Sequence, residues 1–344
     1  MIRHARASSI FIFQSMGYAS SVCFAGFYSG RFGYKKSIAL SFAISSFVLF
    51  LISFVKVFSV FYIFSFILGF ATGIYLPSVI PFITEYFAEN NWGKSIAIHD
   101  SAASISIFST PFITLFFLNF FSWRGLFEVF AVVLLISAII FYSISGEIKI
   151  RHSEKMRLGN LLKTQSLRAL IIIWTFATGA NIGLYLIVPL YLTKELSLSI
   201  GYANSILGIS RLGGIGVAVL CGFLIDRFNL RKLMFAMLFL SGIFTVLAGV
   251  VPARFIGFSL FFQVIFVTGF FPTALVIVTK MFGRETRSMA TGIILAFSVI
   301  FGGGLVPYML GFAGDLLSFR FGISLLGILV TLSSLLIFST KELN

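Results

Sequence analysis

Arg211 has the most evident chemistry in this sequence, because it is a charged residue inside a long apolar run. It lies 15 positions before Asp226, which stands at the polar end of that run. At about 1.5 Å per helical residue, the two are roughly 22 Å apart. A guanidinium at that depth in a bilayer is costly unless it meets water, a carboxylate or an anionic solute. Two interpretations stay open: Arg211 binds an anionic substrate, or it forms a fixed ion pair between helices.

Neutral polar residues occupy similar depths in other apolar runs. Asn181 and Tyr185 are one helical turn apart and therefore point the same way, and Gln14 and Tyr18 form a second such pair. Gln263 lies near the middle of a further run. Each residue could be an interhelical hydrogen bond or a substrate contact. Together with the arginine they predict a hydrogen-bonding substrate cavity that contains one cation.

Three titratable residues are candidates for proton coupling. His99 and Asp100 lie about one and a half turns inside an apolar run, and histidine changes charge near neutral pH. The alternative is a polar contact at the rim, with Lys94 as a partner. Glu128 is a second carboxylate candidate, although it is close enough to a helix end to be solvated or to pair with Arg124.

No residue pattern indicates an enzyme, a cofactor or a metal site. The histidines His4, His99 and His152 lie in different regions, and neither a nucleophile motif nor a phosphate-binding loop is present. Cys23 and Cys221 fall in separate apolar runs and indicate neither a disulfide framework nor a metal cluster.

Composition explains why these polar residues are conspicuous. The chain has 344 residues, of which 59% are hydrophobic and 10% charged, and its mean hydropathy is +1.06. A soluble domain cannot bury that much apolar surface, whereas each membrane-spanning helix needs about 20 apolar residues. The net charge of +14 does not indicate nucleic-acid binding, because the cations stand at the ends of apolar runs. The sequence therefore predicts an all-α polytopic membrane protein, with the lipid bilayer as its main partner.

We predict eleven membrane-spanning helices, at residues 8–28, 37–55, 58–83, 95–120, 125–144, 168–192, 200–225, 233–251, 255–280, 289–312 and 319–339.

Charge in the connections sets the expected orientation. One set of alternate loops with the C-terminal tail holds 17 Lys and Arg residues, and the other set with the N-terminus holds 7. Since cationic loops stay in the cytoplasm, the first set and the C-terminus are predicted to be cytoplasmic. The long polar segment 145–167 then becomes a cytoplasmic linker.

The chain contains an internal repeat with an offset of 196 residues. A polar turn at residues 26–36 recurs at residues 222–232, and the apolar runs that precede the two turns also align. Pro111 and Pro307 share the same offset. The repeat predicts two related halves, each with a tight polar turn between two spans.

The two turns resemble the signature loop Gly-x-Leu-x-Asp-Arg-x-Gly-Arg-Lys of the major facilitator superfamily. That loop lies between the family's second and third helices and is echoed between its eighth and ninth. The first copy has Gly30 for the aspartate, and the second has Asn229 for the second glycine. The residues that carry the resemblance are Gly26, Arg31, Gly33 and Lys35 in the first copy, and Gly222, Leu224, Asp226, Arg227 and Arg231-Lys232 in the second.

The resemblance implies two pseudo-symmetric helical bundles that rock about a central site. It places Asn181, Tyr185 and Gln263 on helices that line the cavity. It also implies a gating role for the signature turns, in which Asp226 contacts the start of a helix in the other half near Lys94. Gly30 cannot make the equivalent contact.

Five spans precede the linker and six follow it, and the first signature turn follows the first span instead of the second. We therefore expect an N-terminal bundle at 1–144 and a C-terminal bundle at 168–344, with the family's first of twelve helices missing from this chain.

Small residues predict where helices approach closely. Gly69-x-x-x-Gly73-x-x-x-Pro77 allows close packing in the third span, and Gly302-Gly-Gly304 allows the tenth to bend or pack tightly. The family's drug–proton antiporters carry an arginine where this chain has Ser65, and a Gly-x-x-x-Gly-Pro pattern before the proline that aligns with Pro111. Both departures count against drug efflux.

These observations predict a monomeric secondary transporter of the cell membrane that moves a small solute. An organic anion, with protons as the candidate coupling ion, is preferred because of Arg211. The alternatives are efflux of a hydrophobic or drug-like compound, and a truncated remnant that does not transport.

Overall fold

The computed structural model describes residues 4–88, 91–146, 164–282 and 284–340. These residues are almost entirely helical and contain no strand, as the sequence predicts. The first half contains α1 (His4–Cys23), α2 (Ala25–Ser53), α3 (Phe58–Gly73), α4 (Tyr75–Tyr86), α5 (Trp92–Leu118) and α6 (Trp123–Ile144).

The second half begins with one long bent span, α8 (Gln165–Thr178), η2 (Gly179–Gly183), α9 (Leu184–Leu190) and η3 (Tyr191–Glu195). It continues with α10 (Ile200–Arg227), α11 (Leu230–Val250), η4 (Ala253–Phe255), α12 (Ile256–Met281), α13 (Arg284–Phe297), η5 (Ser298–Leu305), α14 (Val306–Leu316), α15 (Phe319–Leu335) and η6 (Leu336–Ser339). Residues 147–163 lie outside the described residues, so the predicted linker stays a prediction.

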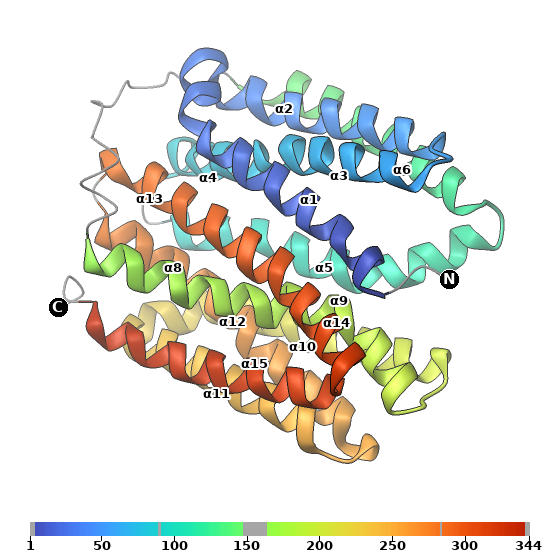
Figure 1. Cartoon of the computed structure of the whole chain (residues 1–344). Helices are drawn as coiled ribbons and strands as arrows, with labels where there is room; N and C mark the ends of the chain where they lie inside the picture. Colours follow the sequence, from blue (N-terminus) through green and yellow to red (C-terminus); the bar gives the residue numbers. More distant parts are fainter. Residues whose placement is uncertain (1–3, 89–90, 147–163, 283, 341–344) are drawn as a thin grey trace.

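The helices run side by side in two groups that follow the two halves of the sequence (Figure 1). Two helices of the first half make most of the contact with the second half. α1 lies against α13, η5 and α14, and α5 lies against α10 and α12. The arrangement therefore confirms two helical bundles with a long shared interface.

Nine helical segments of the described residues are long and apolar enough to cross a membrane. The other two predicted spans, 8–28 and 95–120, fall on α1 and α5, where several side chains lie outside the described residues. The count of eleven is thus not confirmed.

The third predicted span is broken between α3 and α4, at Ile74. Pro77 has no amide hydrogen to donate to the carbonyl four residues earlier, that of Gly73, so the helical ladder is interrupted there. Two other spans contain π-helical turns, η2 and η5, that likewise interrupt the regular ladder. η5 contains Gly302, which packs against Thr175 and Gly179, so the close packing predicted for the tenth span is confirmed.

The two signature turns have different backbones. Gly33 has φ +82°, a conformation that favours glycine, and it interrupts α2. Asn229, at the equivalent position, has φ −61° and caps α11, since its side chain accepts a 3.1 Å hydrogen bond from the amide of Lys232. The asparagine therefore replaces a glycine where the backbone does not need one. The first predicted span also ends earlier than expected, because α1 stops at Cys23.

Candidate functional site

Arg211 lies on α10 with its guanidinium against the bent span that begins the second half. Its Nη1 donates a 2.9 Å hydrogen bond to Oδ1 of Asn181, and its Nη2 donates a 3.1 Å bond to the backbone carbonyl of Asn181. The residue is only 6% exposed. Side chain and carbonyl of one residue thus hold two nitrogens of the guanidinium.

Tyr185 supports the guanidinium from one face. The arginine Cζ lies 3.5 Å from the centroid of the Tyr185 ring, which is a cation–π contact. The Tyr185 hydroxyl donates to the carbonyl of Leu207, one turn before Arg211 on α10. The ring therefore bridges the bent span and α10 and fixes the plane of the guanidinium.

Gln263 joins the same site from α12. Its Nε2 donates a 3.0 Å hydrogen bond to the carbonyl of Ala180, next to the carbonyl that Arg211 uses. Both carbonyls belong to the π-helical turn η2. The structure thus brings Asn181, Tyr185 and Gln263 together around Arg211, and their role in a substrate cavity stays a prediction.

Among the residues that the structure describes, Arg211 has no carboxylate partner. The carboxylate of Glu195, on the same bent span as Asn181, lies 3.9 Å from Arg320 instead. The partners of Arg211 are an amide, a carbonyl and an aromatic ring. Its Nε is buried and has no hydrogen-bond acceptor among the described residues. The fixed ion pair considered from the sequence is therefore not seen in the described part of the chain, and one donor of the guanidinium is unused.

Gln14 and Tyr18 are placed elsewhere. They lie on α1, which packs on α3 and on the segment η5–α14. Within the described residues, no hydrogen bond joins either side chain to the Arg211 cluster. Their membership of one common cavity stays a prediction.

His99 lies on α5 and meets α4. Its Nε2 is 3.0 Å from the hydroxyl of Tyr75, and the two rings stack with centroids 5.8 Å apart. The side chain of Asp100 lies outside the described residues. Glu128 is exposed on α6, and Arg124 donates instead to the carbonyl of Val55, at 3.0 Å, and covers the Trp123 ring.

The signature turns contain one well-defined tether. Arg231 Nη2 donates a 2.6 Å hydrogen bond to the carbonyl of Thr340, so the second turn holds the end of the last helix. In the first turn, Lys35 covers the Tyr142 ring at 4.7 Å. Arg31 and Arg227 are exposed, and space around Gly222 is open. The surroundings of Gly26 and the side chain of Asp226 lie outside what the structure describes, so the gating role of these turns stays a prediction.

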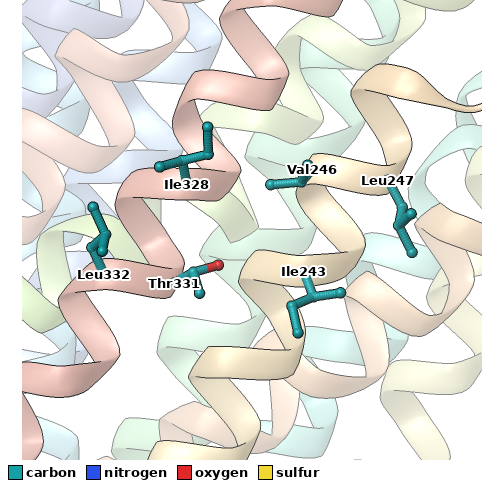
Figure 2. A pocket seen from close by; sticks show the side chains of 6 residues that line it. All are labelled: Ile243, Val246, Leu247, Ile328, Thr331 and Leu332. Atoms are coloured by element: carbon teal, nitrogen blue, oxygen red, sulfur yellow. The ribbon is translucent and has the colours of Figure 1, made fainter.

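An apolar hollow of about 280 Å³ lies away from Arg211, between α11 and α15 (Figure 2). Its lining is Ile243, Val246, Leu247, Ile328, Thr331 and Leu332. The only hydroxyl in that lining, on Thr331, already donates to the carbonyl of Gly327. The hollow offers no free polar group for a solute.

Sequence reasoning missed Glu195. This residue ends the bent span, and its carboxylate accepts hydrogen bonds from the amides of Phe319 and Arg320 at the start of α15. A carboxylate at a helix N-terminus is stabilised by the unpaired amides and the helix dipole. The sequence signal was available: Ser318 caps α15 and marks where that helix begins.

Comparisons with known proteins agree with this architecture. The D-xylose–proton symporter is 16% identical with a TM-score of 0.78, over 100% of this chain and 89% of the symporter. FucP in its outward conformation is 15% identical with a TM-score of 0.76, over 99% of this chain and 91% of FucP. A variant of the E. coli fucose:proton symporter FucP is 14% identical with a TM-score of 0.71, over 98% of each chain.

No curated protein matches the chain. The family model for the Major Facilitator Superfamily matches residues 2–222 and 169–343, which together span nearly the whole sequence. The resemblance of the signature turns is thereby confirmed. The chain belongs to the Major Facilitator Superfamily, whose members are membrane transporters.

Proposed function

We propose that this protein transports a small organic anion across the cell membrane by alternating access, and that the anion binds at Arg211. Membership of the family supports secondary transport as the general activity. The nature of the cargo is argued from the site itself.

The observation that carries the proposal is the uncompensated charge of Arg211. A buried guanidinium in a membrane protein needs an anion or water nearby. Asn181 and Tyr185 orient it without neutralising it, and its Nε has no acceptor in the part of the chain that the structure describes. A carboxylate that accepts from this free donor supplies the missing negative charge in a short, charge-assisted contact.

His99 is the residue that we propose for proton coupling, because its ring is held in one orientation by Tyr75. On this hypothesis, uptake of the anion into proteoliposomes rises with an imposed proton gradient, and the His99→Gln variant loses that dependence. Uptake by wild type that ignores the gradient would contradict it.

Thermal stability of the purified protein tests the cargo class directly, because a ligand that binds only the folded state raises the melting temperature. The probes are small mono- and dicarboxylates, with fucose and xylose as neutral comparisons. Wild type is compared with Arg211→Gln, and with Arg254→Gln as the matched control, an exposed arginine in η4, just before α12.

We expect at least one carboxylate to stabilise wild type and Arg254→Gln, with Kd raised at least about tenfold in Arg211→Gln. If Arg211→Gln does not fold, Arg211→Lys keeps the charge but not the planar fork, and we expect weaker binding there too. Equal stabilisation of wild type and Arg211→Gln by carboxylates, or stabilisation by the neutral sugars alone, would refute anion binding at Arg211.

A further inference from the structure

We propose that the cargo of the Arg211 site carries a hydroxyl group beside its carboxylate, and that Gln263 is the residue that recognises this hydroxyl. The inference rests on the proposed function, because it takes binding of an anion at Arg211 as given, and it narrows the cargo to hydroxycarboxylates. The two amide side chains of the site, those of Asn181 and Gln263, decide the cargo class because each is locked in one orientation.

Arg211 locks the amide of Asn181. A guanidinium has only N–H donors, so the atom that faces its Nη1 at 2.9 Å must be the amide oxygen. Nδ2 of Asn181 then points away from the guanidinium with two N–H donors, and no recorded hydrogen bond within the described ranges uses them. Nε of Arg211 also lacks an acceptor in that part of the chain. The site therefore offers a carboxylate N–H donors from both residues.

Gln263 is locked the opposite way round. The carbonyl oxygen of Ala180 can only accept, so the atom that faces it at 3.0 Å must be Nε2 of Gln263. Oε1 therefore points away as an acceptor, and the recorded bonds of the described residues supply no donor to it. Gln263 is only 2% exposed, and a buried acceptor without a partner is costly. A donor on the cargo satisfies that acceptor.

Two features place this acceptor close to the guanidinium. The two side chains donate to the carbonyls of consecutive residues of η2, Ala180 and Asn181, whose Cα atoms are about 3.8 Å apart. α10 and α12 also pack closely beside the site, since a Cβ built on Gly214 would lie 3.3 Å from Cγ1 of Val264. These two residues follow the arginine by one turn and the glutamine by one position. One small solute can therefore reach both side chains.

The neighbouring hydroxyl groups are already engaged. Tyr185 and Ser210 both donate to the carbonyl of Leu207, so their hydrogens are not available to a carboxylate. The polar groups left for a solute are the N–H donors on one side and the glutamine carbonyl on the other. A simple carboxylate uses the donors and leaves the acceptor empty.

The group that meets Gln263 is a hydroxyl and not an ammonium. In a small amino acid, the ammonium would lie near the charge of Arg211, which meets no carboxylate among the described residues. Like charges in a site of low dielectric constant repel each other strongly. A hydroxyl donates one hydrogen bond without adding charge. Hydroxycarboxylates therefore fit the site better than amino acids of the same size.

Isothermal titration of the purified protein with matched acids tests this assignment. Propionate, lactate (both enantiomers) and alanine share a three-carbon skeleton and differ only in the substituent next to the carboxylate. Hexanoate and gluconate provide a six-carbon pair. Each acid is titrated into wild type, Arg211→Gln, Gln263→Leu and Gln165→Leu. The last variant is the matched control, because Gln165 is an exposed glutamine at the start of α8.

In wild type and in Gln165→Leu, we expect the hydroxy acid to bind about two- to tenfold more tightly than its parent acid, as one added hydrogen bond would give. In Gln263→Leu, the Kd of the parent acid stays near that of wild type and the advantage of the hydroxy acid disappears. A purely structural role of Gln263 would instead weaken both acids alike. If Gln263→Leu does not fold, Gln263→Met keeps an unbranched side chain of similar length and replaces it.

Equal Kd values for hydroxy acid and parent acid in wild type, with both lost in Arg211→Gln, would overturn the hydroxyl assignment and leave anion binding at Arg211 intact. Tighter binding of alanine than of lactate would overturn it in favour of an ammonium. A hydroxyl advantage that survives in the folded Gln263 variants would remove Gln263 from its recognition. Binding of none of these acids would refute the anion site and this inference together.

Discussion

A buried arginine that meets no carboxylate among the described residues must be stabilised by other groups, and Tyr185 is one of them. The ring lies under the guanidinium, and the hydroxyl is bonded to Leu207 on the same helix as Arg211. Tyr185 therefore has two separable roles. The ring stabilises the charge, and the hydroxyl fixes where the ring lies.

Two substitutions separate these roles. Tyr185→Phe removes one hydrogen bond and keeps the ring, so we expect a loss of about 0.5–1.5 kcal/mol in stability, with binding of the anion largely retained. Tyr185→Leu also removes the cation–π contact, which contributes about 2 kcal/mol when desolvated. Thermal unfolding and ligand titration of both variants provide the check. Equal ligand affinity in Tyr185→Leu and wild type would show that the ring does not orient Arg211.

The sequence was sufficient to predict the composition of this cluster in part. Arg211 could be identified as a candidate because it lies deep inside an apolar run. The spacing of Asn181 and Tyr185 showed that the two side chains point the same way. The same reasoning marked Gln14 and Tyr18, which no hydrogen bond among the described residues joins to the cluster. The difference lies in how helices are rotated against each other. The π-helical turn η2, which turns the carbonyls of Ala180 and Asn181 toward their donors, is not evident from residue spacing.

At the scale of elements, glycines decide which helices cross closely. α1 and α3 are in backbone contact, because a Cβ on Gly69 would overlap the carbonyl of Gln14, and one on Gly17 would overlap that of Phe66. The predicted close approach at Gly69 and Gly73 is therefore confirmed. α11 and α15 use the same device at Gly242 and Gly327, which the sequence analysis did not single out.

Gly69→Ala should destabilise the protein, since a backbone must move to admit the methyl group; overpacking of this kind costs about 1–3 kcal/mol. Gly216→Ala is the matched control, because nothing lies within 4 Å of a Cβ at that glycine in α10. We expect its melting temperature to equal or exceed that of wild type. A Gly69→Ala variant as stable as Gly216→Ala would show that α1 and α3 separate without cost.

Helix ends were harder to predict than helix existence. Eleven apolar runs indicate where helices lie, but the break at Ile74 depends on one missing amide hydrogen at Pro77. Glu195 shows the same limit. The sequence analysis did not single it out, and only the meeting of η3 with α15 gives it two backbone partners.

At the scale of the molecule, the internal repeat is the strongest basis for predicting the architecture. The positions at which the two halves differ are also informative. Gly33 and Asn229 occupy one repeat position with different backbones, and α6 and α15 occupy another with different burial. The large core of the second half has no equivalent in the described part of the first. A two-fold pattern therefore predicts the architecture, whereas local sequence decides how each copy is completed.

The distribution of cations over the loops predicts the orientation of the whole molecule. Lys36 belongs to the cation-rich set of connections and Arg254 to the cation-poor set, and both side chains are exposed. In a background with Cys23→Ser and Cys221→Ser, a membrane-impermeant maleimide should label Arg254→Cys in intact cells and Lys36→Cys only after permeabilisation. The reason is that cationic loops resist translocation, so the signature turns stay in the cytoplasm. The reverse pattern would show that the protein has the opposite orientation in the membrane. Labelling of both cysteines in intact cells would mean that loop charge does not set its orientation.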